Sequence, residues 1–344
     1  MGYIDKTYNE LLEKILKEGK NKKDRTNTGT LSLFGYQIRY NMKQGFPLLT
    51  TKKMYYKGII TELLWFLSGD TNIKYLVDNG CNIWNDNSYK NYERRWETEG
   101  KFLSPPVNKF TKEEFINEIK TNWMNARELG ALGPIYGKQW RDWGGEFSSG
   151  HWNSKTNKLG VYFGGVDQIK NLIEQLKTNP DSRRLMVNAW NVGELDQMTL
   201  PPCHYGFQVY TRELSMEEKE EWCRNNSNHM DCPMRTISLM WNQRSVDTLL
   251  GLPFNIASYG LLLEIIAKEV NMVPDELIGN LGDVHLYNNH ITYAEEQVTM
   301  RDTTIESPEL VFNKKNNIFD YNVEDFEFDN YKPQPNWKNV PIAV

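Results

Sequence analysis

Three strand-like runs followed by one long apolar helix constrain the fold of this chain most strongly. The runs lie near residues 184–190, 205–211 and 236–241, and apolar residues continue at helical spacing over roughly residues 256–270. A helix and a sheet each bury an apolar face, so they pack against one another. We therefore predict an α+β fold in which the strands form one sheet and helices cover it.

Further elements are expected on either side of this region. Apolar residues at helical spacing predict a helix over residues 4–18. Thr111 and Glu114 have the spacing of a capping box, which predicts the start of a second helix. A third helix is expected over about residues 166–176, and a strand over residues 30–41.

Two polar stretches interrupt this pattern and are interpreted as insertions. Residues 88–130 are highly charged and contain the helix predicted from Thr111. Residues 213–235 include the charged run 217–221, which is usual on a solvated face. Neither an internal repeat nor a low-complexity linker divides the sequence.

Composition and motif content exclude several classes of protein. The formal net charge of −5 and the lack of a long Lys/Arg run argue against a duplex-binding protein. No Gly-x-Gly-x-x-Gly follows a strand and no Gly-Lys-Ser/Thr loop occurs. The sequence therefore lacks the main motifs of dinucleotide-binding and nucleoside-triphosphate-binding folds. Four widely spaced cysteines indicate neither a disulfide framework nor a zinc ribbon. Since no signal peptide and no membrane-spanning run is present, we expect a cytoplasmic protein without a membrane partner.

A thiol directly after two prolines is the strongest candidate for a nucleophile. The segment Leu-Pro-Pro-Cys-His ends in Cys203 and His204, and the rigid prolines hold the thiol in one place. A lone cysteine is more often a small buried apolar residue. Positive charge from Arg183, Arg184 and Arg244 favours the catalytic reading, because arginine stabilises a thiolate and also grips phosphate.

The neighbouring arginines carry a geometric implication of their own. On a strand, Arg183 and Arg184 would point to opposite faces, so both could not serve one site within one subunit. This hints at a site shared across a subunit interface. Exposure of one arginine to solvent is the alternative.

An amide at the start of the long helix is a candidate for reading a base. Asn255 follows the Gly-Leu-Pro-Phe turn 251–254, where an asparagine is usually a helix cap. Its side chain offers one donor and one acceptor, which match O4 and N3–H of uracil. Cytosine presents the opposite pattern.

Three further polar side chains stand at informative places. His285 and Tyr287 share one face of an extended segment and could hold a sugar hydroxyl, although a buried structural histidine is an equal alternative. Glu62 lies within the apolar run 59–67. Burial raises the pKa of a carboxyl group and would fit Glu62 to proton transfer.

Seven separated segments of this chain resemble the thymidylate synthase family, in the family's order. Besides the segments around Cys203, Asn255 and His285, these are four motifs: Arg-Thr-x-Thr-Gly-Thr (25–30), Thr-Thr-Lys-Lys (50–53), Glu-Leu-Leu-Trp-Phe-Leu-x-Gly-Asp-Thr-Asn-Ile (62–73) and Gly-Pro-Ile-Tyr-Gly-Lys-Gln-Trp-Arg (133–141). The tail Pro-Ile-Ala-Val (341–344) resembles the family as well. It covers most of the chain outside the two insertions. It implies one catalytic domain over residues 1–344, with a large mixed sheet that packs back to back in a homodimer.

The resemblance implies methylation of dUMP by 5,10-methylenetetrahydrofolate, with dTMP and dihydrofolate as products and no metal. The catalytic residues would be Cys203, which attacks C6 of uracil, with Glu62, Tyr136, Arg244, Asp247 and Asn255. The substrate dUMP would be bound by Arg25, Arg183, Arg184, His204, Gln243, Arg244, Ser245, Asp247, Asn255, His285 and Tyr287, with Arg183 and Arg184 reaching the phosphate from the other subunit. The folate would contact Lys52, Ile83, Trp84, Asp247, Leu250, Gly251, Phe254, Ala343 and Val344. No specific nucleic acid is required.

Three departures from the family pattern affect the folate lid. Asn87 replaces a second tryptophan that is common in bacterial members, and Gln334 stands where the family has histidine between two prolines. The tail also carries one extra residue before Val340. The chemistry does not depend on these positions.

Three other functions remain as alternatives. A dUMP hydroxymethylase would let water, not hydride, trap the methylene group, but Trp84 and the apolar tail argue for excluding water. A Cys–His hydrolase would use Cys203 with His285 and has no need of the arginines. A metal-binding protein would use Cys223, His229 and Cys232, which lack a fourth ligand.

Overall fold

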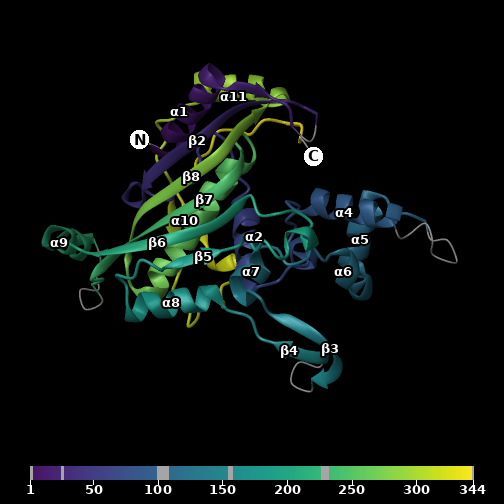
Figure 1. Ribbon diagram of the computed structural model, residues 1–344. Coiled ribbons are helices and arrows are strands. Elements are labelled where there is room, and N and C mark those ends of the chain that lie inside the picture. The colour runs from purple at the N-terminus through teal and green to yellow at the C-terminus, as the bar shows by residue number, and fades with distance from the viewer. Residues whose placement is uncertain (1–2, 25–26, 99–107, 154–157, 226–231, 343–344) are drawn as a thin grey trace. The chain divides into compact units, whose positions relative to one another are not determined.

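The computed structural model describes residues 3–24, 27–98, 108–153, 158–225 and 232–342. It contains a six-stranded sheet with the strand order β1-β2-β8-β7-β6-β5 (Figure 1). The strands are β1 (Lys20–Lys22), β2 (Thr30–Asn41), β5 (Met186–Asn188), β6 (His204–Glu213), β7 (Arg235–Asp247) and β8 (Val273–Tyr287). The pair β7–β8 is parallel, whereas β1–β2, β2–β8 and β6–β7 are antiparallel. The predicted α+β fold with a large mixed sheet is therefore confirmed.

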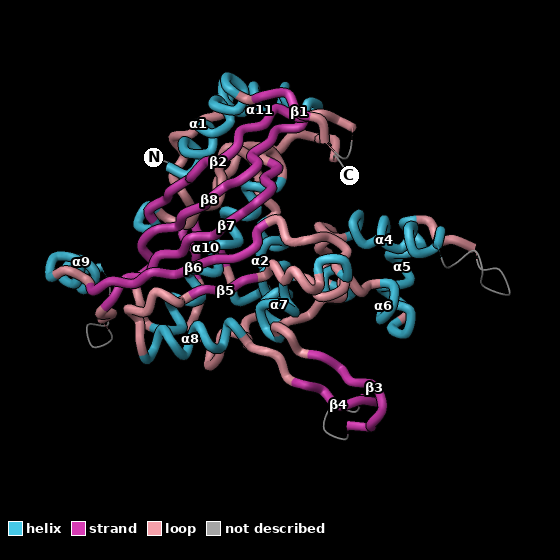
Figure 2. The backbone as a smooth tube through the Cα atoms, viewed as in Figure 1, coloured by secondary structure: helices cyan, strands magenta, loops and turns pink. Residues whose placement is uncertain are grey.

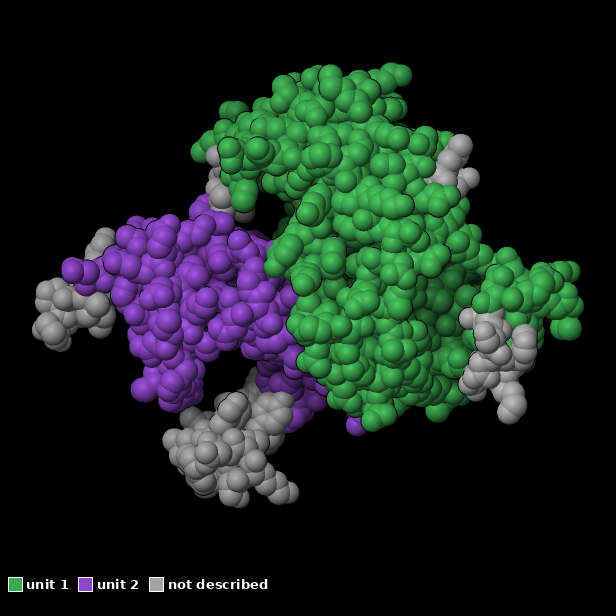
Figure 3. All heavy atoms as spheres, turned by 180° about the vertical axis from the view of Figure 1, so that it is seen from behind, with its two compact units in different colours: residues 1–60, 173–186, 203–344 green, residues 61–172, 187–202 purple. Residues whose placement is uncertain are grey.

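The chain divides into two compact units (Figure 3). The first comprises residues 1–60, 173–186 and 203–344, and the second comprises residues 61–172 and 187–202. Among the described residues, no helix is long and apolar enough to cross a membrane.

In the first unit, helices cover one face of the sheet. They include α10 (Gly251–Val270), which packs on β7 and β8, and α1 (Tyr3–Glu18), which packs on β2 and on α11 (Ile291–Met300). Alternate residues of β7, namely Ile237, Leu239 and Trp241, are buried, as expected for one face of a strand. Helix α10 has buried residues along nearly its whole length, so it forms the centre of this core.

The other face of the same strands carries exposed side chains. Tyr210 of β6 is 65% exposed, and a hollow of about 430 Å³ on this face is lined in part by Arg39, Met240 and Ile278. The helix α9 (Met216–Asn225) follows the C-terminal end of β6 and forms residues 216–225 of the predicted insertion 213–235.

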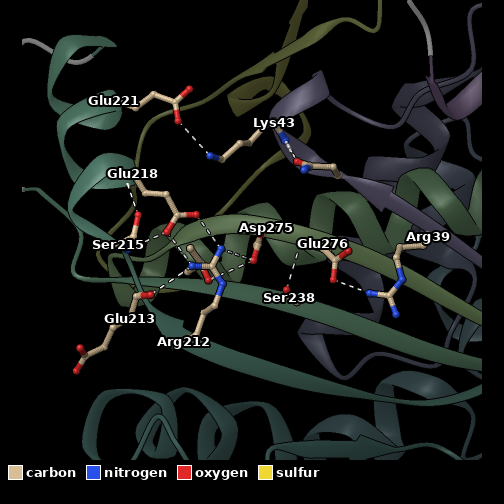
Figure 4. Close-up of polar contacts among 12 residues, drawn as sticks. Arg39, Lys43, Arg212, Glu213, Ser215, Glu218, Glu221, Ser238, Asp275 and Glu276 are labelled. Carbon is tan, nitrogen blue, oxygen red and sulfur yellow. Dashed lines mark hydrogen bonds and ion pairs between the residues drawn. The ribbon is translucent and has the colours of Figure 1, made fainter.

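Arginine 212 fixes helix α9 to the sheet. Its guanidinium donates to both carboxylate oxygens of Glu218, each over 2.8 Å, and to Asp275 of β8 over 3.1 Å (Figure 4). Lys43 forms an ion pair with Glu221 on the same helix. Residues 216–225 of the insertion therefore form a helix that charged groups attach to the sheet.

The first unit also contains parts of two helices, a small second sheet and three short 3₁₀ turns. The helix α2 (Tyr56–Ser68) begins in this unit, and α8 (Gln168–Thr178) ends in it. A small antiparallel pair is formed by β9 (Glu309–Val311) and β10 (Glu327–Asp329). Short 3₁₀ turns are η1 (Met42–Gln44), η5 (Asn288–His290) and η6 (Val323–Asp325).

The second unit is mainly helical. It contains α3 (Lys74–Asp78), α4 (Asn85–Thr98), α5 (Lys112–Thr121), α6 (Trp123–Leu129), α7 (Tyr136–Asp142) and the 3₁₀ turn η3 (Leu195–Gln197). The antiparallel hairpin of β3 (Glu146–Asn153) and β4 (Lys158–Phe163) is drawn in magenta in Figure 2. The capping box of Thr111 and Glu114 is present, with both reciprocal bonds, so the predicted start of α5 is confirmed.

Some sequence expectations need correction. The strand expected near residues 184–190 shrinks to β5, because the Met186 N–H donates to the Arg184 carbonyl in a tight turn. The stretch 88–130 holds three helices or parts of helices where one was expected. The hairpin β3–β4 was not anticipated, and β8 was expected only at its C-terminal end.

Candidate active site

The site in the first unit begins where β6 pairs with β7. The Arg244 N–H donates to the Cys203 carbonyl over 2.8 Å, one residue before the register pair of His204 with Gln243. This backbone pairing places Cys203, the residue just before β6, next to Arg244 of β7. The sequence expectation that Arg244 stands near Cys203 is confirmed at the level of the backbone. The thiol is half-buried, and the arginine is exposed.

His204 takes a different place from the one expected of a substrate ligand. It is buried, and its Nδ1 lies 2.8 Å from the hydroxyl of Tyr259 on α10. Burial lowers the pKa of His204 to about 3, so the ring is neutral. The Tyr259 ring stacks on Trp241, with centroids 5.3 Å apart. His204 therefore anchors the start of β6 to the core behind Cys203.

The orientation of Asn255 follows from a chain of hydrogen bonds. The indole Nε1 of Trp241 can only donate, and it donates to Gln243 Oε1 over 3.1 Å. Gln243 Nε2 must then be the donor to Asn255 Oδ1, at 3.0 Å. The Asn255 amide is left with its Nδ2 group as the donor for a ligand, and its oxygen keeps one lone pair.

Asn255 is not a helix cap. Helix α10 begins at Gly251 and has Leu250 as its N-cap, so Asn255 lies within the helix. The capping alternative considered from the sequence is wrong for this residue. The turn before the helix is held by Asp247, whose Oδ1 accepts from the Leu250 N–H over 3.3 Å.

The C-terminal ends of β7 and β8 meet at the same edge of the sheet. Because the two strands are parallel, Ser245 stands opposite Asp283 and Asp247 stands opposite His285. His285 and Tyr287 are both half-buried, and their rings meet edge to face with centroids 5.3 Å apart. The prediction that these two residues share one face is consistent with this contact.

Lys52 is buried beside the turn that leads into α10. Its Nζ donates to the Leu249 carbonyl over 2.5 Å and lies over the rings of Tyr8 and Trp337. Burial lowers the pKa of Lys52 to about 7, although the charges of Asp247 and Asp5 raise it. The neighbouring candidates Leu250, Gly251 and Phe254 are half-buried in the first turn of α10 and its N-cap.

The arrangement of Lys52 depends on Asp5, which the sequence reading missed. The buried carboxylate of Asp5 accepts from the backbone N–H groups of Thr50 and Thr51 and from their hydroxyls. These five hydrogen bonds hold residues 50–51, which directly precede Lys52 in the chain. An aspartate between Ile4 and Tyr8, on the apolar side of a predicted helix, was the available signal.

The tail approaches the same part of the first unit. Pro341 O accepts from His290 Nε2 over 2.6 Å, and the Gln334 N–H donates to the Thr50 carbonyl over 2.8 Å. Gln334 also exchanges two bonds with the backbone of Asp302. The glutamine that departs from the family pattern therefore has a complete set of partners.

In the second unit, three predicted residues come together. Trp84 Nε1 donates to Glu62 Oε1 over 2.7 Å, and the Tyr136 ring lies edge to face with the Trp84 ring at 6.0 Å. Burial raises the pKa of Glu62 to about 7, although the Trp84 bond lowers it. Ile83 is exposed, and Cys81 is buried near Glu62, which the sequence reading did not notice.

The arginine pair lies outside any strand. Arg183 and Arg184 are exposed in the turn before β5, so the argument from strand alternation does not hold for them. Arg183 helps to line a hollow of about 440 Å³ with Gln208 and Arg235. Both arginines are therefore exposed because they lie in this turn, and not because they alternate along a strand.

Four candidates lie outside the described residues: Arg25, His229, Ala343 and Val344. Among the described residues, no three His, Cys, Asp or Glu side chains gather as ligands for a metal ion.

The chain matches a family of methyltransferases over nearly its whole length. The family model of thymidylate synthase matches residues 6–344. The chain is 43% identical to the thymidylate synthase of Mycoplasma mobile over 338 residues, which cover 98% of this chain and 99% of the relative. It is 42% identical to that of Mycoplasma genitalium over 330 residues (96% and 97%), and 44% identical to that of Aster yellows witches'-broom phytoplasma over 327 residues (95% and 96%). The chain belongs to the thymidylate synthase family, whose reaction in general is the methylation of dUMP to dTMP.

Proposed function

We propose that this chain methylates dUMP reductively with 5,10-methylenetetrahydrofolate and releases dTMP and dihydrofolate, through a covalent adduct of Cys203 at uracil C6. The observation that carries the proposal is the backbone bond from the Arg244 N–H to the Cys203 carbonyl, which pairs the segment that carries the thiol with the strand that carries the arginine. Arginine stabilises thiolates and binds phosphate, and both are needed for a nucleotide substrate.

The covalent step assigns a role to each group around the base. The Cys203 sulfur forms a bond to C6, and the electron pair of the C5–C6 double bond makes C5 nucleophilic while charge develops at O4. Asn255 holds O4 and N3 of uracil, and its fixed amide orientation supports this role. Glu62 relays protons near O4, and its pKa of about 7 suits that task. Tyr136 helps to remove the C5 proton.

The rest of dUMP is held at the strand ends and in the loop before β2. We assign the ribose hydroxyl to His285 and Tyr287. The phosphate is assigned to Arg25, Arg244 and Ser245, with Arg183 and Arg184 from a second subunit. His204 and Gln243 support these groups indirectly, since their side chains are bonded to Tyr259 and Asn255.

The folate co-substrate supplies the one-carbon unit and the hydride. In the first unit, the first turn of α10 is half-buried and offers apolar surface. In the second unit, the Trp84 ring is of the flat apolar kind on which a pterin stacks. Contacts are assigned to Lys52, Ile83, Trp84, Asp247, Leu250, Gly251, Phe254, Ala343 and Val344. Among the described members of this set, Lys52 and Asp247 are the charged groups, and the others offer apolar surface or backbone.

We further propose that the active protein is a homodimer, and that both units belong to one catalytic domain in a cytoplasmic enzyme. The exposed sheet face supports the dimer, because Tyr210 is largely exposed there and hollows of about 430 and 440 Å³ lie beside it. The continuous family match over residues 6–344 supports one domain.

Incubation of the purified protein with dUMP and methylenetetrahydrofolate tests the reaction. The expected result is dihydrofolate, seen by its absorbance, in equal amount to dTMP. Release of tetrahydrofolate with a hydroxymethylated nucleotide would establish the hydroxymethylase instead. Hydrolysis of a reporter ester without any nucleotide product would point to the Cys–His hydrolase.

A further inference from the structure

A tryptophan in the C-terminal part of the first unit lies against two cations. The Nζ atom of Lys52 is 5.8 Å from the centre of the Trp337 ring, and the guanidinium carbon of Arg301 is 4.8 Å from it. A cation within about 6 Å of an aromatic ring is attracted by the negative face of that ring. The Tyr293 and Trp337 rings also meet edge to face, with centroids 5.7 Å apart. One aromatic ring is therefore shared by two positive charges.

Hydrogen bonds fix the backbone just before Trp337. The Gln334 N–H donates to the Thr50 carbonyl over 2.8 Å, and Nη1 of Arg301 donates to the Pro335 carbonyl over 2.7 Å. The same arginine thus contacts both the backbone of this segment and the ring that follows. The place of the Trp337 ring is therefore set by a backbone that is held at two points.

The ammonium group of Lys52 is held by three partners. Its Nζ donates to the Leu249 carbonyl over 2.5 Å and lies 5.5 Å from the centre of the Tyr8 ring, besides its contact with Trp337. Lys52 is only 4% exposed. A buried charge is poorly screened by water and ions, so this ammonium acts on an anionic ligand without lying open to solvent.

Opposing influences act on the charge of Lys52. Burial lowers the pKa of Lys52 to about 7, although the charges of Asp247 and Asp5 raise it and that of Arg301 lowers it. The Trp337 ring adds an attraction for the charged form. Lys52 therefore loses its charge near neutral pH, and the ring helps to decide at which pH this happens.

We propose that Trp337 is a positioning residue for the folate co-substrate, because its ring holds the ammonium group of Lys52 in place. The inference rests on the proposed function, in which Lys52 contacts folate. Folate carries carboxylate groups, which a fixed cation attracts. Trp337 acts through Lys52, so its removal should weaken the binding of folate and leave the binding of dUMP unaltered.

Two substitutions separate the aromatic ring from its bulk. Trp337→Leu removes the ring and should raise the KM for methylenetetrahydrofolate about fivefold, while kcat and the KM for dUMP change less than about twofold. Trp337→Phe keeps a ring and should raise the KM less than about twofold. The indole Nε1 has no hydrogen-bond partner among the described residues, so the change to phenylalanine breaks no bond with them. Trp123→Leu, at an exposed position at the start of α6, is the matched control and should leave all three constants unchanged.

A double-mutant cycle tests whether Trp337 acts through Lys52. Lys52→Met removes the cation and keeps an unbranched apolar side chain. In that background Trp337→Leu should have no further effect on the KM for methylenetetrahydrofolate, because the interaction between the two residues is already lost. An equal rise in both backgrounds would overturn the positioning role, since the ring would then contribute by a route that does not involve Lys52.

The pH dependence of binding gives a second readout that needs no turnover. Calorimetric titration with tetrahydrofolate in the presence of dUMP should show tighter binding below a pH of about 7, where Lys52 is charged, than above it. In Trp337→Leu the midpoint should move to lower pH by about half a unit, because the charged form loses an attraction. Lys52→Arg stays charged throughout and should remove this transition. Any pH dependence that remains in Lys52→Arg belongs to other groups, such as Glu62.

Three outcomes would overturn the proposal. They are an unchanged KM for methylenetetrahydrofolate in Trp337→Leu, an equal rise in Trp337→Leu and Trp337→Phe, and a loss of kcat alone, which reports a smaller folded fraction. Should Trp337→Leu not fold, Trp337→Met decides by the same criteria. Failure of the wild-type protein to form dihydrofolate is a separate result, which would count against the proposed function.

Discussion

Gln243 donates from Nε2 to Oδ1 of Asn255 over 3.0 Å, and this bond fixes the direction in which the Asn255 amide faces. A donor is thereby presented to the ligand from a side chain that cannot flip without breaking this partly buried bond. Replacing this NH2 group by an oxygen atom, as in Asn255→Asp, therefore tests whether Asn255 sets the preference for uracil.

Asn255→Asp should lower the efficiency on dUMP and raise the relative use of dCMP. The donor that faces O4 becomes an acceptor, which repels O4 but accepts from the amino group of cytosine. An unsatisfied buried polar group costs about 1–3 kcal/mol, so the preference should change roughly tenfold to hundredfold. Parallel specificity constants for the two nucleotides measure it, and dUMP binding should survive. An unaltered preference would mean that the base is read elsewhere.

Cys203→Ser should abolish turnover while dUMP still binds. A hydroxyl group is a far weaker nucleophile than a thiolate near neutral pH, whereas Arg244 and Asn255 remain in place. Steady-state rates and equilibrium binding of dUMP check the two halves of this expectation. The covalent mechanism could not stand if the variant kept appreciable turnover.

Mixing two inactive proteins should restore activity if the sites are shared. Cys203→Ser subunits and Arg183→Glu subunits each lack one part, and a hybrid dimer would hold one site with both parts intact. Because Arg183 is exposed in a turn beside the open sheet face, its replacement should leave the fold unchanged. Mass spectrometry must verify the hybrid. No recovery in a verified hybrid would contradict the proposed crossing of Arg183 and Arg184.

Glu62→Gln should stabilise the protein at pH 8 and change its stability little at pH 5. The folded state raises the pKa of Glu62 from 4.5 to about 7, so its stability contribution is full below about pH 4.5 and is lost as the pH rises through about 7. The difference corresponds to at most roughly 3 kcal/mol at pH 8.

Urea unfolding at the two pH values measures the effect, and catalytic activity should fall in the same variant. Glu113→Gln, at an exposed position in the first turn of α5, is the control. Equal changes in stability at pH 5 and pH 8 would show that burial of the Glu62 charge is not the cause.

Local sequence signals predicted the elements that depend on neighbours in the chain. Thr111 and Glu114 started α5 as expected because a capping box is complete within four residues. The apolar run of α10 also predicted a central helix, although the helix begins at Gly251, several residues earlier than expected.

Tertiary contacts decided what the sequence could not indicate. Nothing local shows that Gln243 would orient Asn255, or that Tyr259 would draw His204 into the core. For Arg183 and Arg184 the sequence predicted a wrong local structure: a strand was expected, but a tight backbone turn is present. The argument that the two side chains point to opposite faces of a strand therefore does not apply. Cys203, Arg244 and Glu62 could be selected because a thiol after prolines and a carboxylate in an apolar run are unusual without a function.

The position of β8 between β2 and β7 has a consequence for synthesis of the protein. Gln37 of β2 bonds to Asn280 of β8 across 243 positions of the chain. A nascent chain therefore exposes unpaired edges of β2 and β7 until β8 leaves the ribosome, and pairing of such distant segments is slow. A shortened N-terminal product that lacks β8 would leave both edges unpaired and would lack His285 and Tyr287 of the proposed nucleotide site.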